Sequence, residues 1–493
     1  MNNTIVFSEF RQGADHKPNN KPCQDYARNF PSEEMAIITL SDGHGGKKYF
    51  RSQYGAEIAT EIALDTLKTF CEEADFDELL GNDDLIQIPV SKETDGSHRE
   101  LEYVMRHVFQ HICSEWHRKI EEHFQDNPLT PDEEAFLRKE TENGTALYDY
   151  YFDRSGDSIK KNLPSAYGCT LFGVAETKSG YWVGFHIGDG KCVAFNEDGS
   201  WYQPILWDER CFLNKTTSLS HYGEESFRYC IGRNLPAAIF IASDGMDDSY
   251  APMTELAFEY AMKFMANLAI NGEDYTSRNI GLWLDKISEN YSKDDMSIGY
   301  IVSSERLLDV LQNYMEKTAI IINDEYEALS KEANNKNKEY DDQLEKKNRL
   351  SFQIDSERST INNLDKDGIK LQEQYEANQY LIEQEKKKRE RARKNFLSRF
   401  KRSRKLSPDS SNDVVYHDIE KENTELDITI KEIVEESEKI DLKIEDLSNR
   451  LRSLERDLPV TKKHAMEATR NLNVVESKLK RINKIKAILN KQS

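Results

Sequence analysis

The chain has 493 residues, 38% of them hydrophobic, and a net charge of −22 from 89 acidic and 67 basic side chains. This length allows two to four domains, but the hydrophobic content supports one sizeable core better than three. The acidic balance excludes general nucleic-acid binding over the whole surface and leaves room only for a local basic patch.

The sequence contains no signals for export or membrane insertion. There is no charged, apolar, cleavable segment at the N-terminus and no run of about 20 apolar residues. The seven cysteines are odd in number and form no CxxC pair, which favours reduced, buried thiols over disulfides or a zinc site. We therefore expect a soluble, cytoplasmic protein without a transmembrane segment.

The composition changes after Ser303. Every cysteine, every tryptophan and nearly all glycines precede this point, and the sequence after it is rich in Glu, Lys, Asn, Leu and Ile. This change predicts a globular domain over residues 1–303 and a helical region over residues 304–493.

The first half of the globular domain mixes strands with helices. Apolar runs predict strands over 4–10 and 35–40, and apolar residues at helical spacing predict helices over 51–70 and 101–124. The acidic stretch between these two helices is expected to be a loop.

The second half reads as short strands joined by turn residues. A helix is expected over 254–268, and residues 196–235 lack periodicity, so we expect a mobile flap there. The predicted strands cover 169–175, 181–187, 191–195, 237–242 and 296–302.

Aspartates stand where several of these apolar strands begin or end. Asp42, Asp244 and Asp294 lie beside turn residues, and Asp25, Asp189 and Asp248 are similarly placed. Carboxylates gathered at strand ends supply the oxygen ligands that Mg²⁺ and Mn²⁺ prefer. Taken singly, each Asp-Gly pair is also a common turn, so the order of all the segments is the more specific signal.

That order resembles the metal-dependent protein phosphatases, the protein phosphatase 2C family, in its bacterial form. The resemblance covers nearly all of residues 1–303 and does not extend to the helical region. It implies an αββα sandwich, with two antiparallel sheets between layers of helices. The matching segments are Cys23-Gln24-Asp25, Ser41-Asp42-Gly43-His44-Gly45-Gly46, Tyr167-Gly168-Cys169-Thr170, Gly188-Asp189-Gly190, Ser243-Asp244-Gly245-Met246-Asp247-Asp248 and Asp294-Asp295-Met296-Ser297.

The resemblance also implies a set of metal ligands for two Mn²⁺ or Mg²⁺ ions. Asp42 would bridge the ions, and the carbonyl of Gly43 would complete one site. Asp244 and Asp294 would bind the other ion, and Asp25 would act through a water. Asp189 and Asp248 match the acids that hold a third, weaker ion in many members of the family.

Two such ions, about 3.5–4 Å apart, activate a water for attack on a phosphate and neutralise the phosphoryl oxygens. By resemblance, His44 would donate a proton to the departing serine or threonine alkoxide, and its reference pKa of about 6.5 suits that role. The alternative is that His44 caps a helix or supports the metal ligands.

Two positions depart from the family pattern. Many members carry an arginine shortly before the Asp25 position to anchor the substrate phosphate, and this chain has none there. His16, Lys17 or Lys21 could take its place, although lysine lacks the bidentate fork of arginine. Gln24 stands where many members have glutamate.

The region after residue 303 shows heptad spacing, for example at Ile419, Leu426, Ile433, Ile440 and Leu447. We expect a coiled coil folded as a helical hairpin, with arms at about 304–405 and 414–493. The turn formers at about 406–413 mark the bend. The alternative is a parallel dimer along this region.

The segment 386–405 is densely basic and contains Phe396, Leu397 and Phe400. It is suited to contact an anionic membrane surface, a nucleic acid or an acidic protein, and the alternative is a solvated hairpin tip.

Three hypotheses follow. The first is a metal-dependent serine/threonine phosphoprotein phosphatase, with a cognate kinase and a coiled coil that recruits a partner, self-associates or regulates. The second is an inactive phosphatase fold that serves as a scaffold or phosphate-sensing module. In the third, the coiled coil senses a signal or assembles a complex, and the phosphatase domain is its output.

Overall fold

The computed structural model describes residues 3–88, 96–142, 144–152, 162–211, 215–221, 226–250, 253–399 and 411–491. Most of the turn predicted at 406–413 and the end of the basic segment, residues 400–405, lie outside these ranges. Residues 411–413 belong to a helix. None of the helices in the described ranges is both long enough and apolar enough to cross a bilayer.

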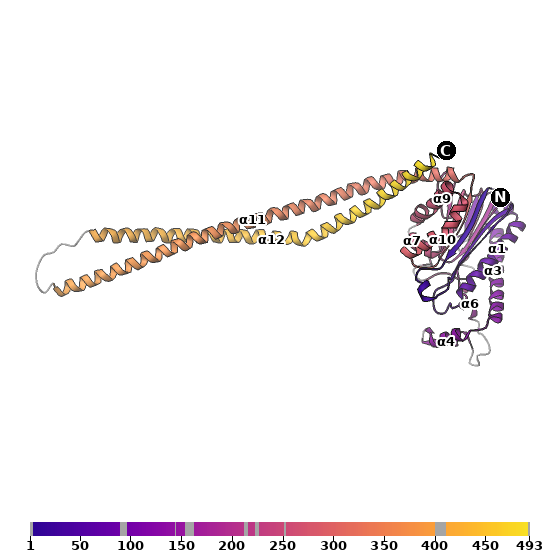
Figure 1. The fold of residues 1–493 in the computed structure, drawn as a ribbon, viewed down its shortest axis with the longest axis horizontal. Coiled ribbons are helices and arrows are strands. Elements are labelled where there is room, and N and C mark those ends of the chain that lie inside the picture. The colour runs from indigo at the N-terminus through magenta and orange to yellow at the C-terminus, as the bar shows by residue number, and fades with distance from the viewer. Residues whose placement is uncertain are drawn as a thin grey trace. The chain divides into compact units, whose positions relative to one another are not determined.

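Two antiparallel sheets form the centre of the first part of the chain, as predicted (Figure 1). The five-stranded sheet has the order β1 (Thr4–Arg11), β13 (Met296–Ser303), β12 (Ala238–Ala242), β9 (Lys191–Phe195) and β10 (Trp201–Tyr202). The six-stranded sheet has the order β2 (Asp25–Pro31), β3 (Met35–Asp42), β7 (Leu171–Thr177), β8 (Tyr181–Ile187), β11 (Arg228–Arg233) and β4 (Leu85–Ile88). A small third sheet pairs β5 (Thr141–Glu142) with β6 (Thr145–Ala146).

Strand β3 is buried on both faces, which explains its uninterrupted apolar run. Ile38 faces the core between the sheets together with Ile241 and Ile301. Its neighbour Ile37 faces the opposite side, in the core shared with the helices. Side chains alternate along a strand, so one continuous apolar run supplies two cores at once.

Helices cover both outer faces and complete the αββα sandwich. Helices α1 (Ser52–Glu73) and α3 (Arg99–Asp126) lie on one side of the strands, and α9 (Lys263–Asn271) and α10 (Glu273–Asn290) lie on the other (Figure 1). The remaining short helices are η1 (Lys17–Asn19), α2 (Phe76–Leu80), α4 (Pro131–Lys139), α5 (Leu147–Tyr151), α6 (Leu163–Ala166), α7 (Asp244–Tyr250), α8 (Met253–Glu255) and the π-helix η3 (Leu256–Met262).

Two expectations about local structure were wrong. The predicted loop between the first two helices contains α2 and β4. The predicted flap over 196–235 contains β11, which is paired on both sides, so its last part belongs to the sheet. The helix predicted over 254–268 is present, since α8, η3 and α9 follow one another without a break, and its middle part is π-helical. Tertiary pairing decides such segments, and local periodicity does not report it.

The chain divides into two compact units, residues 1–321 with 480–493, and residues 322–479. The predicted domain boundary at residue 303 falls between β13 and the next helix, α11 (Leu307–Arg399). The last helix, α12 (Ser411–Leu489), ends in the first unit.

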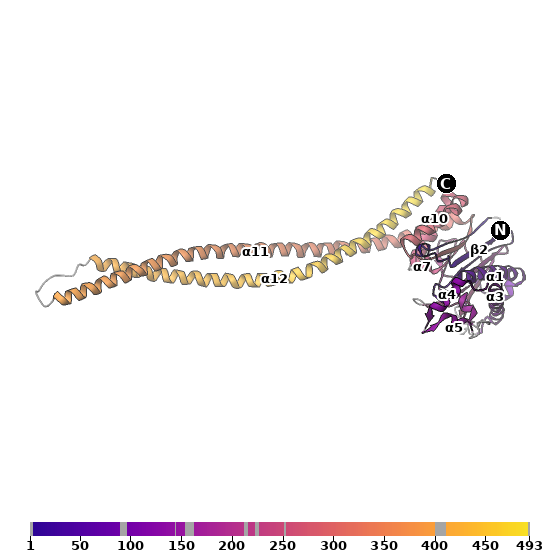
Figure 2. The same cartoon turned by 60° about the horizontal axis from the view of Figure 1, so that its bottom comes forward.

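Within residues 322–479, α11 and α12 lie side by side (Figures 1 and 2). Lys347 pairs with Glu455 at 3.4 Å and Glu357 with Lys443 at 2.5 Å, while Gln374 Nε2 donates to Glu422 at 3.1 Å. Residue numbers rise along α11 as those of their partners fall along α12, so the helices run antiparallel. This confirms the predicted helical hairpin.

Both ends of the hairpin are anchored within the first unit. Lys317 of α11 pairs with Asp198 at 2.7 Å in the turn after β9. At the end of α12, Arg481 pairs with Glu259 of η3, and its guanidinium lies 5.9 Å from the Phe258 ring centre. Ile482 is fully buried.

Glu176 on β7 is an acid buried in the sandwich, and it gives the first testable prediction. Its Oε1 atom has no hydrogen-bond partner among the residues that the structure describes, and burial raises the pKa of Glu176 to about 8, despite the attraction of Arg306. The folded state therefore holds this proton more tightly than the unfolded state, whose carboxyl has a pKa of 4.5. The protonated Glu176 carboxyl contributes fully to the free energy of unfolding below the unfolded-state pKa of 4.5. Above that pH, this contribution falls by about 1.4 kcal/mol per pH unit as the pH rises toward 8.

Glu176→Gln cannot ionise, so its stability relative to wild type should rise by roughly 4 kcal/mol between pH 5 and pH 8. Urea unfolding of both proteins at the two pH values measures the difference. A difference that is the same at pH 5 and pH 8 would contradict the prediction.

Candidate active site

The ends of strands from both sheets meet at one place and bring the predicted acids together. Asp25 lies opposite Asp42 in the β2–β3 pair, and Ser297 Oγ of β13 donates to Asp25 Oδ2 at 2.7 Å. Ser243, just before Asp244, accepts at its Oγ from Ser297 N at 3.0 Å. Three segments far apart in sequence are therefore tied together by short hydrogen bonds at the strand ends.

A cleft of about 910 Å³ opens at this point. Asp25 is only 2% exposed, lies behind the cleft and does not line it, and Lys17 does not line it either. The predicted residues that do line it are His16, Lys21, Asp42, Gly43, His44, Asp189, Asp244, Asp248 and Asp294.

The carboxylates of the cleft repel one another. Burial, followed by the charges of Asp244 and Asp25, raises the pKa of Asp42 well above its usual range. Burial likewise raises the pKa of Asp244 to about 7, and the two side chains share a hydrogen bond. Several carboxylates close together in a partly buried cleft form a negative site with hard oxygen donors, which fits Mg²⁺ or Mn²⁺.

No three His, Cys, Asp or Glu side chains in the described ranges already stand close enough to hold an ion. The fit therefore rests on the chemistry and charge of the donors.

His44 is held by its backbone. His44 N donates to the Gly168 carbonyl at 3.0 Å, and the His44 carbonyl accepts from Gln24 Nε2 at 2.9 Å and Ser52 Oγ at 3.0 Å. A glutamate carboxylate in place of Gln24 could not donate this bond, which gives the substitution a structural reason. Desolvation lowers the pKa of His44 to about 4, so the ring is neutral at neutral pH.

Comparison with known proteins identifies the family. Residues 12–285, more than half of the chain, match the sequence model of protein phosphatase 2C. The chain belongs to the protein phosphatase 2C family. The match ends before Asp294, which therefore rests on the motif and on its position in the cleft. None of the curated proteins compared with this chain matches it.

Solved structures with similar folds include several phosphatases. RsbX in complex with magnesium is 9% identical and covers 60% of this chain and 94% of its own, with a TM-score of 0.30. A bacterial serine phosphatase is 16% identical and covers 61% and 98%, with a TM-score of 0.32. A phosphatase from Toxoplasma gondii is 12% identical and covers 61% and 92%, with a TM-score of 0.31.

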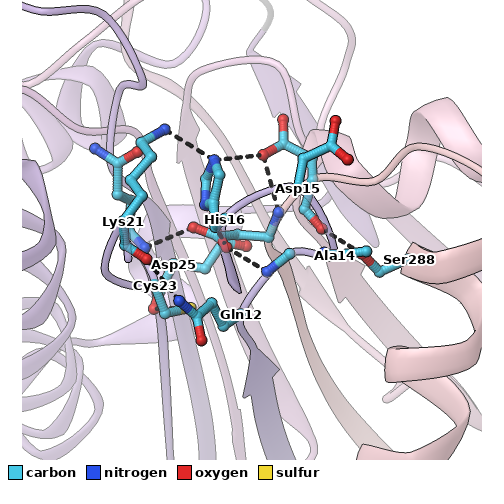
Figure 3. Close-up of polar contacts among 12 residues, drawn as sticks. Gln12, Ala14, Asp15, His16, Lys21, Cys23, Asp25 and Ser288 are labelled. Carbon is cyan, nitrogen blue, oxygen red and sulfur yellow. Dashed lines mark hydrogen bonds and ion pairs between the residues drawn. The ribbon is translucent and has the colours of Figure 1, made fainter. Parts of the chain in front are cut away.

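The rim of this phosphatase cleft carries an ordered array of three side chains. Lys21 Nζ donates to His16 Nε2 at 2.8 Å (Figure 3). His16 Nδ1 in turn donates to Asp295 Oδ1 at 2.8 Å. Asp295 also accepts from the backbone nitrogens of Gly13 and Gln24, each at 2.6 Å. Lys17 instead pairs with Asp285 at 3.0 Å. The array holds Lys21 at the cleft, while Lys17 is held elsewhere.

Sequence reasoning missed several residues that shape the phosphatase cleft. Arg210, Lys215 and His221 line it from the stretch expected to be a flap. Arg228, 1% exposed, donates to the carbonyls of Gly188 and Leu206 and so ties the turn carrying Asp189 to this stretch. In the sequence, Arg228 could have been noticed only as an arginine at the start of an apolar strand. Asp295 could have been noticed as the second of two adjacent acids, Asp294 and Asp295.

Proposed function

We propose that this protein phosphatase hydrolyses phosphoserine and phosphothreonine in cytoplasmic proteins, with Mg²⁺ or Mn²⁺. The observation that carries the proposal is the convergence of carboxylates from both sheets on one cleft, where the pKa of Asp42 is raised well above its usual range, in a chain of the phosphatase 2C family. The magnesium in the RsbX structure supports the choice of metal. Seven free cysteines agree with a reducing compartment.

In this proposal, Asp42, Asp244 and Asp294 hold two divalent cations, with the Gly43 carbonyl completing one site and Asp25 acting through a water. Asp189 and Asp248 would hold a third cation. When bound, the cations make an attacking water acidic enough for neutral pH and offset the charge on the phosphoryl oxygens.

His44 is the proposed proton donor to the leaving alkoxide. Its ring lines the cleft and packs edge-on against Tyr49, with the ring centres 4.8 Å apart. A phosphate dianion close to the ring favours the protonated form and counters the desolvation that lowers the pKa of His44.

Lys21 is the proposed anchor for the substrate phosphate, in place of the family's arginine. Its ammonium lies beside Gly45, 3.3 Å from where a β-carbon on that glycine would stand. Loss of a charged hydrogen bond to phosphate costs about 1.5–3 kcal/mol, so Lys21→Ala should lower kcat/KM for p-nitrophenyl phosphate by about 10- to 100-fold. Lys21→Arg should retain most of the activity.

Lys17→Ala is the matched control for Lys21→Ala. Lys17 is a nearby lysine in the same stretch of chain, but it pairs with Asp285 outside the cleft. Equal kinetics for the two alanine variants would exclude Lys21 as the anchor.

The helical hairpin is the proposed recruiting or regulatory element, through a partner protein, such as a cognate kinase, or through self-association. Its long antiparallel surface and the basic residues 386–395 support a binding role. In the alternative proposals, the same basic residues would bind an anionic membrane surface or a nucleic acid.

The deciding experiment is hydrolysis of p-nitrophenyl phosphate and a phosphoserine peptide by the purified full-length chain. Activity should require added Mn²⁺ or Mg²⁺ and disappear with a chelator. Unchanged activity after chelation would refute the metal dependence. Calorimetry that detects no divalent-metal binding would instead favour an inactive, phosphate-sensing scaffold.

A further inference from the structure

A buried arginine, Arg51, stands just before helix α1 and a few residues after the glycine loop of the cleft, residues 43–46. Arg51 is only 2% exposed, although its charge would normally keep it in water. Its Nε and Nη2 atoms each donate to the Glu133 carboxylate at 2.9 Å, which is a bidentate pair. Nη1 donates to the Asn127 carbonyl at 2.7 Å and to Tyr167 Oη at 3.2 Å.

Glu133 belongs to a segment, residues 127–142 and 144–151, that makes several contacts with the same short stretch of chain. We call it the brace segment. Lys47 pairs with Glu140 at 2.6 Å and Lys48 with Glu142 at 3.4 Å. Tyr151 Oη donates to the Lys48 carbonyl at 2.5 Å. These contacts fall on residues 47–51, immediately after the glycine loop.

Two series of contacts connect Arg51 with the proposed metal-binding and proton-donor residues. The first involves the next residue, Ser52, whose hydroxyl donates to the His44 carbonyl at 3.0 Å. A β-carbon on Gly43 would lie 2.8 Å from the Ser52 carbonyl oxygen, so the two backbones are in close contact. The second passes through Tyr167, which precedes the Gly168 carbonyl that accepts from His44 N at 3.0 Å.

The end of the brace that holds Arg51 is itself fixed. Thr130 and Glu133 form a reciprocal capping box at the start of α4, in which Thr130 N donates to Glu133 Oε2 at 2.9 Å. One carboxylate therefore both caps the helix and grips the guanidinium. Arg51 is buried and the Glu133 side chain is 26% exposed. A largely buried ion pair of this kind adds little net stability compared with apolar side chains, so its clearest effect here is to fix a geometry.

We propose that Arg51 and Glu133 are positioning residues, and that the brace segment holds the Gly43–His44 backbone in the geometry that binds divalent metal. This inference rests on the proposed function. It assigns to residues outside the cleft a measurable share of the metal affinity.

The test compares two substitutions on the same helix. Glu133→Gln removes the charge that grips Arg51 and keeps the shape and the cap. Glu134→Gln is the matched control, since Glu134 pairs with Arg138 at 2.6 Å on the exposed face of α4. Mn²⁺ binding by calorimetry, the Mn²⁺ concentration for half-maximal hydrolysis, and the melting temperature without metal are measured for each.

Glu133→Gln should weaken Mn²⁺ binding about 10-fold or more, the size of effect seen when a group supporting metal ligands is lost. Glu134→Gln should match wild type. In Arg51→Met/Glu133→Gln, an apolar side chain replaces the guanidinium while glutamine keeps the cap of α4, so the same loss of Mn²⁺ affinity should appear in a protein that the metal-free melting temperature shows to be folded.

Mn²⁺ affinity within twofold of wild type for Glu133→Gln or for the folded double variant would overturn the inference and leave the proposed function standing. A wild-type protein that binds no Mn²⁺ would overturn the proposed function and this inference with it.

Discussion

Asp42→Asn should abolish metal-dependent hydrolysis and at the same time raise the melting temperature of the metal-free protein. The loss should exceed about 100-fold, since even groups one step removed from a metal cost 10- to 100-fold when changed. The gain in stability has a separate cause: Asp42 lies partly buried beside Asp244, and like charges in a poorly solvated place oppose folding. An amide of the same shape removes one of the two charges.

The measurements are p-nitrophenyl phosphate hydrolysis with added Mn²⁺ and thermal unfolding in chelator at pH 8. Asp65→Asn, at an exposed acid on α1, is the control, and its stability should stay within about 0.5 kcal/mol of wild type. Full activity in Asp42→Asn would remove this residue from the metal site. Reduced stability of Asp42→Asn in chelator would show that repulsion between Asp42 and Asp244 does not oppose folding.

Ile482→Ala should destabilise the phosphatase unit although residue 482 lies far beyond the globular part of the sequence. Its side chain is fully buried in the unit formed by residues 1–321 and 480–493. Truncation of a buried isoleucine to alanine costs about 2–5 kcal/mol, because apolar contact is lost and a cavity remains.

Val474→Ala is the matched control, because Val474 precedes Ile482 on the same helix and its side chain is 51% exposed. Truncation of Val474 should therefore cost no more than about 0.5 kcal/mol. Urea unfolding followed by tryptophan fluorescence reports on the phosphatase unit, because the five tryptophans at 116, 182, 201, 207 and 283 all lie there. Equal stability of the two variants would mean that the end of α12 does not support this unit.

The sequence places several acids at strand ends, and these acids line one cleft, because the signals for strand ends are local. Asp42, Asp244 and Asp294 stand at the ends of apolar runs, and strand ends gather at the edges of sheets. The choice between Lys17 and Lys21 could not be read in this way. Asn20 adopts a left-handed conformation, with φ of 51°, and the turn through it leads the chain from η1 to Lys21 at the cleft.

The contacts of the helical region were hidden for a different reason. Ile482 and Leu489 continue the apolar spacing of the rest of α12, and this spacing is the same whether a helix faces its hairpin partner or another surface. Arg51 and Glu133 are 82 residues apart, and no pattern in either neighbourhood indicates that they meet.

The return of the chain to its first unit affects how the protein is made. Residues 322–479 must be translated after the sandwich and before residues 480–493, which takes roughly 8–30 s at usual elongation rates. During this interval the nascent sandwich holds all the predicted ligands but lacks Arg481 against Glu259 and the buried Ile482. A ribosome that stops within the hairpin therefore releases a chain with every predicted active-site residue and an unfinished catalytic unit.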